Sequence, residues 1–173
     1  MAILAAAQLV PAAALDAYVM DPTPYAWGPL LAPYSPPLPP SGLVILASYF
    51  GDVFVEDEAG VWWVNGLEAR VDRAAPSREA FVERLNRDHL TMLKTKLMDA
   101  LIIADKLLPA GMLYGLKTPR SEGGAYSPDN IGTAPVGVSF TYMGDLYRQK
   151  AAPPQKPKAG KAKAGSRFWS RKS

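Results

Sequence analysis

Hydrophobic and polar positions change their period along the chain, and these changes mark out its elements. Residues 43–49 are almost wholly apolar, which indicates a strand buried on both faces, although a short apolar run also fits a buried helix. Beyond Gly51 the pattern alternates in short runs, as in strands with one buried face. The runs predict an antiparallel meander over 52–56, 61–64 and 67–72, with a two-residue turn at Asn65-Gly66, a pair that accepts positive φ at both positions.

The period then lengthens to that of a helix. Ser77 is a suitable N-cap, and Glu79 in the first turn faces the positive end of the helix dipole. Leucines at helical spacing predict a second helix over 90–108, which Pro109 and Gly111 end.

A second β-rich stretch is predicted after the helices. Residues 112–116 have strand character, and 117–134 form a long loop punctuated by glycine and proline. An alternating pattern, a turn at 143–145 and a closing strand at 146–149 follow. The alternating apolar positions are Val136, Val138, Phe140 and Tyr142.

The expected fold class is therefore α+β. A mostly antiparallel sheet, built from 43–72 and 112–149, packs against the two helices of 77–108. The chain divides into a leader and proline-rich connector (1–42), an α+β domain (43–150) and a basic low-complexity tail (151–173).

Residues 1–20 are apolar and rich in alanine. No lysine or arginine precedes Arg70, so the positive start of a secretion signal is missing, and Pro11 interrupts the run. We favour one or two short helical turns packed on the body; a secretion signal is the alternative, and the run is too short and broken to favour a membrane span.

Eight prolines lie within residues 22–40. Proline fixes φ and removes a hydrogen-bond donor, so this stretch forms neither a long helix nor a central strand. We interpret it as an extended connector held to the body by its large apolar residues; a ligand for SH3-type domains is the alternative. The large residues are Tyr25, Trp27, Leu30, Leu31 and Tyr34.

The charge is divided unevenly along the chain. Residues 1–149 carry 11 basic and 16 acidic residues, a net charge of −5, whereas 150–173 carry 8 basic residues and no acidic one. We expect the tail to be a disordered, solubilising extension. The alternative is a weak contact with nucleic acid or another polyanion, with Phe168 and Trp169 stacking among basic residues. The aromatic pair lies among Arg167, Arg171 and Lys172, and the residues expected to contact the polyanion are Lys156, Lys158, Lys161, Lys163, Arg167, Arg171 and Lys172.

Groupings that carry chemistry are few. The chain has no cysteine and a single histidine, so thiolate chemistry is excluded and a zinc site is disfavoured. Gly123-Gly124 lacks the residues of a phosphate-binding loop and is expected to be a structural turn, and Asn130 is expected to hydrogen-bond the loop backbone. We predict no catalytic residue, cofactor site or metal site.

Acidic and aromatic residues of the meander have two interpretations. The carboxylates Asp52, Glu56, Asp57 and Glu58 are expected at a solvated strand end and turn, because their spacing does not match a calcium loop. Trp62 and Trp63 point to opposite faces of one strand, so one is either covered by the N-terminal segment or exposed as an interface anchor.

Short motifs follow one another in a definite order between residues 27 and 150. They are Phe50-Gly51-Asp52-Val53-Phe54, Asp57 with Gly60, Tyr114-Gly115 with Pro119, Gly123-Gly124 with Tyr126, Asp129-Asn130-Ile131, and Gly144-Asp145-Leu146-Tyr147-Arg148-Gln149. This order resembles the C-terminal domain of type VI secretion immunity proteins, a family that protects bacteria against a secreted DNase effector. Ser121-Glu122 departs from the more apolar character expected there, and the chain resembles the C-terminal domain alone.

The resemblance implies an immunity protein that is not an enzyme. Such a protein acts in the cytoplasm, where it binds a cognate antibacterial toxin, such as a nuclease effector, and occludes its active site. The expected contact residues are Asp57, Glu58, Trp62, Glu122, Tyr126 and Asp129. The alternative function is a regulatory or nucleic-acid-associated protein that acts through its basic tail.

Overall fold

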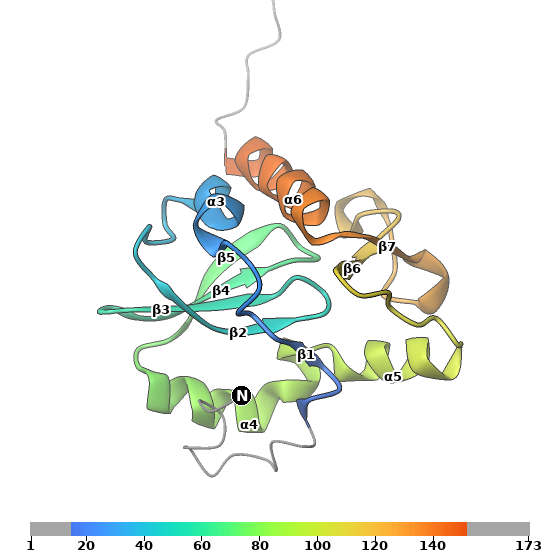
Figure 1. The fold of residues 1–173 in the computed structure, drawn as a ribbon, viewed down its shortest axis with the longest axis horizontal. Helices are drawn as coiled ribbons and strands as arrows, with labels where there is room; N and C mark the ends of the chain where they lie inside the picture. Colours follow the sequence, from blue (N-terminus) through green and yellow to red (C-terminus); the bar gives the residue numbers. More distant parts are fainter. Residues whose placement is uncertain (1–14, 152–173) are drawn as a thin grey trace, which may run out of the picture.

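The predicted meander forms three neighbouring strands of a five-stranded antiparallel sheet in the computed structural model, which describes residues 15–151 (Figure 1). The strands follow one another in chain order across the sheet, each pairing with the next. They are β1 (Val19–Met20), β2 (Leu43–Ser48), β3 (Val53–Asp57), β4 (Gly60–Asn65) and β5 (Arg70–Ala75). The α+β fold class is thereby confirmed, and β1 adds a short edge strand that the polarity pattern did not predict.

The turn between β4 and β5 differs from the prediction. Asn65 pairs with Arg70, so the turn spans residues 66–69, and the only positive φ there belongs to Ala69. Gly66 is required for a different reason: a Cβ on it would lie 2.3 Å from the Phe50 carbonyl oxygen. The glycine therefore lets two turns approach each other, and β5 begins three residues later than expected.

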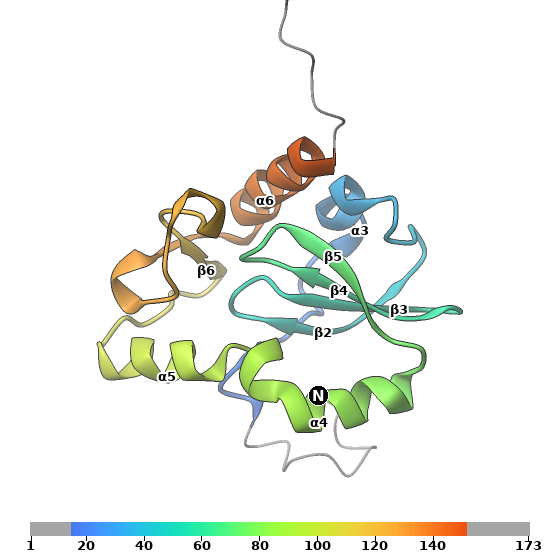
Figure 2. The same ribbon diagram turned by 180° about the vertical axis from the view of Figure 1, so that it is seen from behind.

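Helices cover both faces of this sheet (Figures 1 and 2). On one face lies α4 (Arg78–Met92), whose first turn is capped by Ser77 as predicted: its hydroxyl accepts the Ala80 N–H at 3.3 Å. On the other face lie α3 (Trp27–Leu31), a 3₁₀ turn at Ala32–Tyr34, and α6 (Val136–Ala151).

Side chains alternate along the strands between two apolar clusters. Phe54 and Trp63 pack toward α4, where Phe81 closes the cluster. Val53 and Val64 point the other way, toward Tyr34 of the proline-rich segment and Phe140 of α6. The connector is thus held to the body by its large residues, as predicted, although part of it is helical rather than extended.

The second predicted helix is shorter than the leucine pattern indicates. It is α5 (Thr95–Ile103), and Leu90, one of the leucines on which the longer helix was predicted, is exposed. The helical conformation is interrupted at Lys94, which has a left-handed backbone with φ of 53°. We attribute the break to the inward course of the Lys94 side chain, described below.

The structure differs most from the prediction in residues 112–151. Strands β6 (Met112–Leu116) and β7 (Ile131–Pro135) form a separate two-stranded sheet, joined to the main sheet by the hydrogen bond from Tyr114 N to Tyr49 O at 2.9 Å. The expected strands at 136–149 are instead the single helix α6. Its buried residues Val136, Phe140 and Gly144 recur every fourth position, a spacing that also satisfies a two-residue alternation.

Two predictions fall partly outside the described residues. The helical turns expected within residues 1–20 lie mostly in 1–14, and the basic tail lies in 152–173; both ranges are outside the description. Val19–Met20, at the end of the 1–20 segment, forms strand β1 instead of a helical turn. Between residues 15 and 151, no helix has the length and apolar character needed to cross a membrane.

Candidate functional site

One buried ion pair ties the sheet to the junction of α4 and α5. The Lys94 Nζ lies 2.7 and 2.5 Å from the two carboxylate oxygens of Asp52, and Asp52 is fully buried. The same carboxylate accepts from Ser48 Oγ, Trp63 Nε1 and the Gly66 N–H. The expectation of a solvated Asp52 is therefore wrong: its oxygens serve four segments of the fold.

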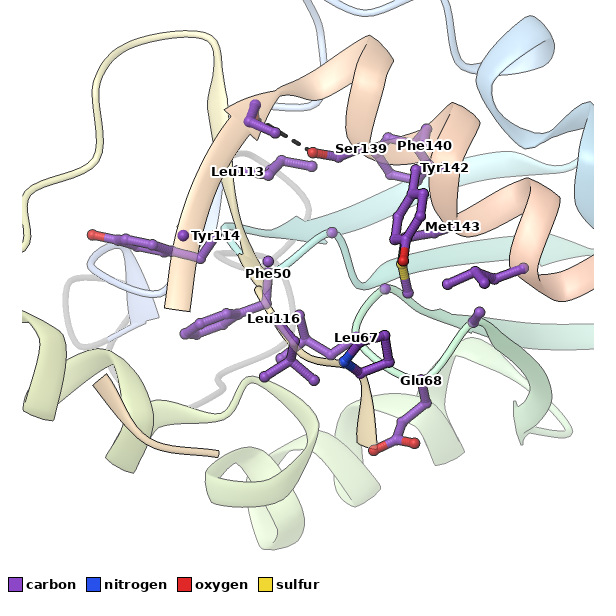
Figure 3. A pocket seen from close by; sticks show the side chains of 18 of the residues that line it. Phe50, Leu67, Glu68, Leu113, Tyr114, Leu116, Ser139, Phe140, Tyr142 and Met143 are labelled. Carbon is purple, nitrogen blue, oxygen red and sulfur yellow. Dashed lines mark hydrogen bonds between the residues drawn. The ribbon is translucent and has the colours of Figure 1, made fainter. Parts of the chain in front are cut away.

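A cavity of about 300 Å³ lies between α6, β6 and the β4–β5 turn; we call it the α6 groove (Figure 3). In Figure 3, Tyr142 and Met143 extend from α6 toward the turn that carries Leu67 and Glu68. Val138 and Tyr142 line the groove and are 58% and 50% exposed, so they border its opening. Its deeper apolar lining includes Phe50, Leu67, Leu113, Leu116 and Phe140.

Charged side chains also line the groove: Glu68, Lys117, Arg120 and Lys150. The Lys117 Nζ donates to the Asp129 carbonyl at 2.9 Å, and the Lys150 Nζ donates to the Glu68 carbonyl at 2.6 Å. Within the part of the chain that the structure describes, none of the three cations forms an ion pair with a carboxylate.

One wall of the groove holds a buried polar atom without a partner. Tyr34 lines the groove, is fully buried, and its hydroxyl makes no hydrogen bond to any described residue. Burial raises the pKa of this phenol, so it stays protonated at neutral pH. The oxygen is not accessible from the groove, so it is an unsatisfied donor within the apolar wall.

Beside the groove, the 117–130 loop has a fixed shape. The Asn130 side chain accepts the Thr118 N–H at 2.9 Å and donates to the carbonyls of Thr118 and Ala125 at 2.9 and 3.0 Å. The predicted backbone role of Asn130 is thereby confirmed. Gly123 has φ of 88°, and a Cβ on Gly124 would lie 1.8 Å from the Thr118 carbonyl oxygen, so the glycine pair forms the structural turn that was predicted.

Tyr126 connects this loop to the main sheet. Its hydroxyl donates to the Glu68 carboxylate, and the Arg120 guanidinium lies 5.0 Å from the centre of its ring. Burial, followed by the hydrogen bond to Glu68, raises the pKa of the Tyr126 phenol, so this donor keeps its proton at neutral pH. The ring nevertheless remains 41% exposed and forms part of the surface.

The six predicted contact residues lie in three places. Asp57 and Glu58 are at the β3–β4 turn, which lies across the molecule from the 117–130 loop (Figure 1). Asp57 accepts the N–H groups of Ala59 and Gly60, so it shapes that turn. Three of the six share the 117–130 loop: Glu122, Tyr126 and Asp129.

Trp62 and Trp63 point to opposite faces of β4, as predicted. Trp63 is buried against Phe54 and α4. Trp62 is partly buried against the cluster that contains Tyr34, and the Arg73 guanidinium lies 5.8 Å from its ring. Trp62 is therefore half-buried on the face of the sheet opposite α4.

Sequence reasoning missed Lys94, Glu68 and the groove. Lys94 and Asp52 are 42 positions apart, and a lysine on a predicted helix carries no local signal of such a partner.

Among residues 15–151, no group of three or more histidine or acidic side chains is arranged to hold a metal ion.

The comparisons with known proteins found no match. No family model, no curated protein and no solved structure matches this chain.

Proposed function

We propose that this chain is an immunity protein that binds a cognate antibacterial toxin in the cytoplasm and blocks that toxin's active site or its access to substrate. A secreted nuclease is the class of toxin that the motif order between residues 27 and 150 indicates. The proposal rests on that resemblance together with the form of the 117–130 loop.

The shape of the loop is the observation that carries the proposal. An exposed loop that is already fixed by Asn130, Gly124 and the Tyr126–Glu68 hydrogen bond loses little conformational entropy when a partner binds. Loops held on a rigid scaffold are common carriers of binding function. The 117–130 loop therefore suits recognition of a preformed surface.

The residues exposed on the loop supply the contact chemistry. Tyr126 offers a half-exposed ring, and tyrosine is enriched among the residues that dominate binding energy. Glu122 and Asp129 are exposed on the same loop, although Asp129 lies 3.7 Å from the Lys106 Nζ. Their carboxylates would complement the basic groups that nucleases present to nucleic acid. Complementary charge of this kind mainly raises the association rate and selects the partner.

Co-expression tests the proposal. The toxin encoded next to this gene is expressed in a sensitive host with and without the chain, and growth and co-purification are measured. We expect rescue and a stable complex. A toxic neighbour that is neither rescued nor bound would contradict the proposal.

Charge reversal then tests the loop itself. Glu122→Lys with Asp129→Lys should slow association at least tenfold, whereas Glu83→Lys on the exposed side of α4 should not. Glu58→Lys, at the opposite end of the sheet, is measured in parallel. If Glu58→Lys weakens binding and the loop variant does not, the contact lies at the β3–β4 turn instead.

A further inference from the structure

The α6 groove has the size and lining of a small-molecule site. Its volume of about 300 Å³ is at the lower end of the range for ligand pockets. At about 30 Å³ per water molecule, this space holds roughly ten waters, or an apolar body of about ten to twelve carbons. Its walls are mostly apolar, with Leu67 on the β4–β5 turn and Phe140 and Met143 on α6 (Figure 3).

The charge of the lining differs from that of the body. Residues 1–150 carry 12 basic and 16 acidic residues, a net charge of −4, yet the groove is lined by three cations and one anion. The anion, Glu68, is already engaged by Tyr126, whereas Lys117, Arg120 and Lys150 have no carboxylate partner among the described residues. An unneutralised group of cations beside an apolar cavity favours a ligand with an anionic head.

We propose that the α6 groove binds a small carboxylic acid with an apolar body of about ten carbons. The apolar body lies between α6 and the β4–β5 turn, where burial of its surface supplies most of the affinity. The carboxylate lies among Lys117, Arg120 and Lys150, which select the acid over a neutral molecule of the same size. This inference does not depend on the proposed toxin.

Calorimetric titration of the full chain alone tests the inference, with decanoate and decanol as probes below their aggregation concentrations. We expect saturable binding of one decanoate per chain and at least tenfold weaker binding of decanol. Absence of saturable decanoate binding at millimolar concentration, or equal binding of decanol, would overturn the proposal.

Variants locate the site. Val138→Asp places a negative charge at the groove opening and should weaken decanoate binding at least tenfold, whereas Ile103→Asp, on an exposed position of α5, should leave it unchanged. Lys117→Gln with Arg120→Gln should weaken decanoate and leave decanol unchanged, with Lys96→Gln as the matched control. Decanoate binding that withstands Val138→Asp would place the ligand elsewhere and overturn the assignment. Because no toxin is present, a negative result leaves the immunity proposal unaffected.

Discussion

At the scale of single residues, the buried Asp52 carboxylate connects several segments of the fold. Its carboxylate accepts from Ser48, Trp63 and Gly66 and pairs with Lys94, so β2, β4, the β4–β5 turn and the α4–α5 junction meet at one group. A buried ion pair recovers its desolvation cost only when such additional bonds satisfy it. Asp52 therefore fixes how these segments are arranged more than it adds net stability.

Removal of the cation tests this role. Lys94→Met leaves the Asp52 carboxylate buried without its counter-ion, so we expect the free energy of unfolding to fall by about 3–5 kcal/mol. Urea unfolding measures the change, and Lys96→Met, at an exposed position two residues further on, should cost less than about 0.5 kcal/mol. If Lys94→Met lowers the free energy of unfolding no more than its control does, the ion pair does not have the structural role described here.

The unpaired hydroxyl of Tyr34 gives a second test at this scale. An unsatisfied buried polar group costs about 1–3 kcal/mol, so Tyr34→Phe should leave the ligand-free protein as stable as before or more stable. Tyr147→Phe is the matched control, because the Tyr147 hydroxyl donates to the Pro36 carbonyl at 3.0 Å and its loss should cost about 1 kcal/mol. If Tyr34→Phe destabilises the protein more than Tyr147→Phe, the Tyr34 hydroxyl already has a partner.

At the scale of elements, the 117–130 loop depends on one side chain for its shape. Asn130→Ala removes three hydrogen bonds at once, whereas Asn130→Asp keeps the acceptor for the Thr118 N–H and loses the two bonds that the amide donates. Amide hydrogen exchange within 118–126 should therefore quicken most for Asn130→Ala and less for Asn130→Asp, with β3 and β4 unchanged. Exchange in the loop that is the same in all three proteins would contradict this account of the loop.

Some secondary-structure elements could be predicted from the sequence and others could not. The meander and the Ser77 cap follow from local pattern, and both were predicted. Helix α6 was missed because Val136 and Phe140 fit both periods; the positions that distinguish them are Val138 and Tyr142, which a strand would place on the buried face and the helix leaves exposed. The helix packs closely on the 3₁₀ turn at Ala32–Tyr34, where a Cβ on Gly144 would lie 2.6 Å from Pro33, and a local window does not contain that contact.

The groove was missed for the same reason. Its walls come from segments near positions 34, 50, 67, 113 and 140, and no local motif connects them. The 117–130 loop was identified, by contrast, because its glycines and Asn130 act on near neighbours.

At the scale of the whole molecule, the acidic body and the basic tail allow toxin binding and polyanion binding to be tested separately. Deletion of residues 152–173 removes 7 of the 19 basic residues, so binding to a polyanion such as single-stranded DNA should be lost. Rescue from the toxin should persist, because the proposed contact lies on the 117–130 loop. Filter binding at low salt and the growth assay measure the two effects separately. Loss of rescue with retention of the fold would favour a function that acts through the tail.

Exchange footprinting of the complex tests the central claim most directly. Amide exchange is measured for the chain alone and for the chain co-purified with its toxin, and the two are compared residue by residue. The account predicts added protection across 117–130 and none at the β3–β4 turn around Glu58. A stable complex that leaves 117–130 as exposed as in the free chain would contradict it.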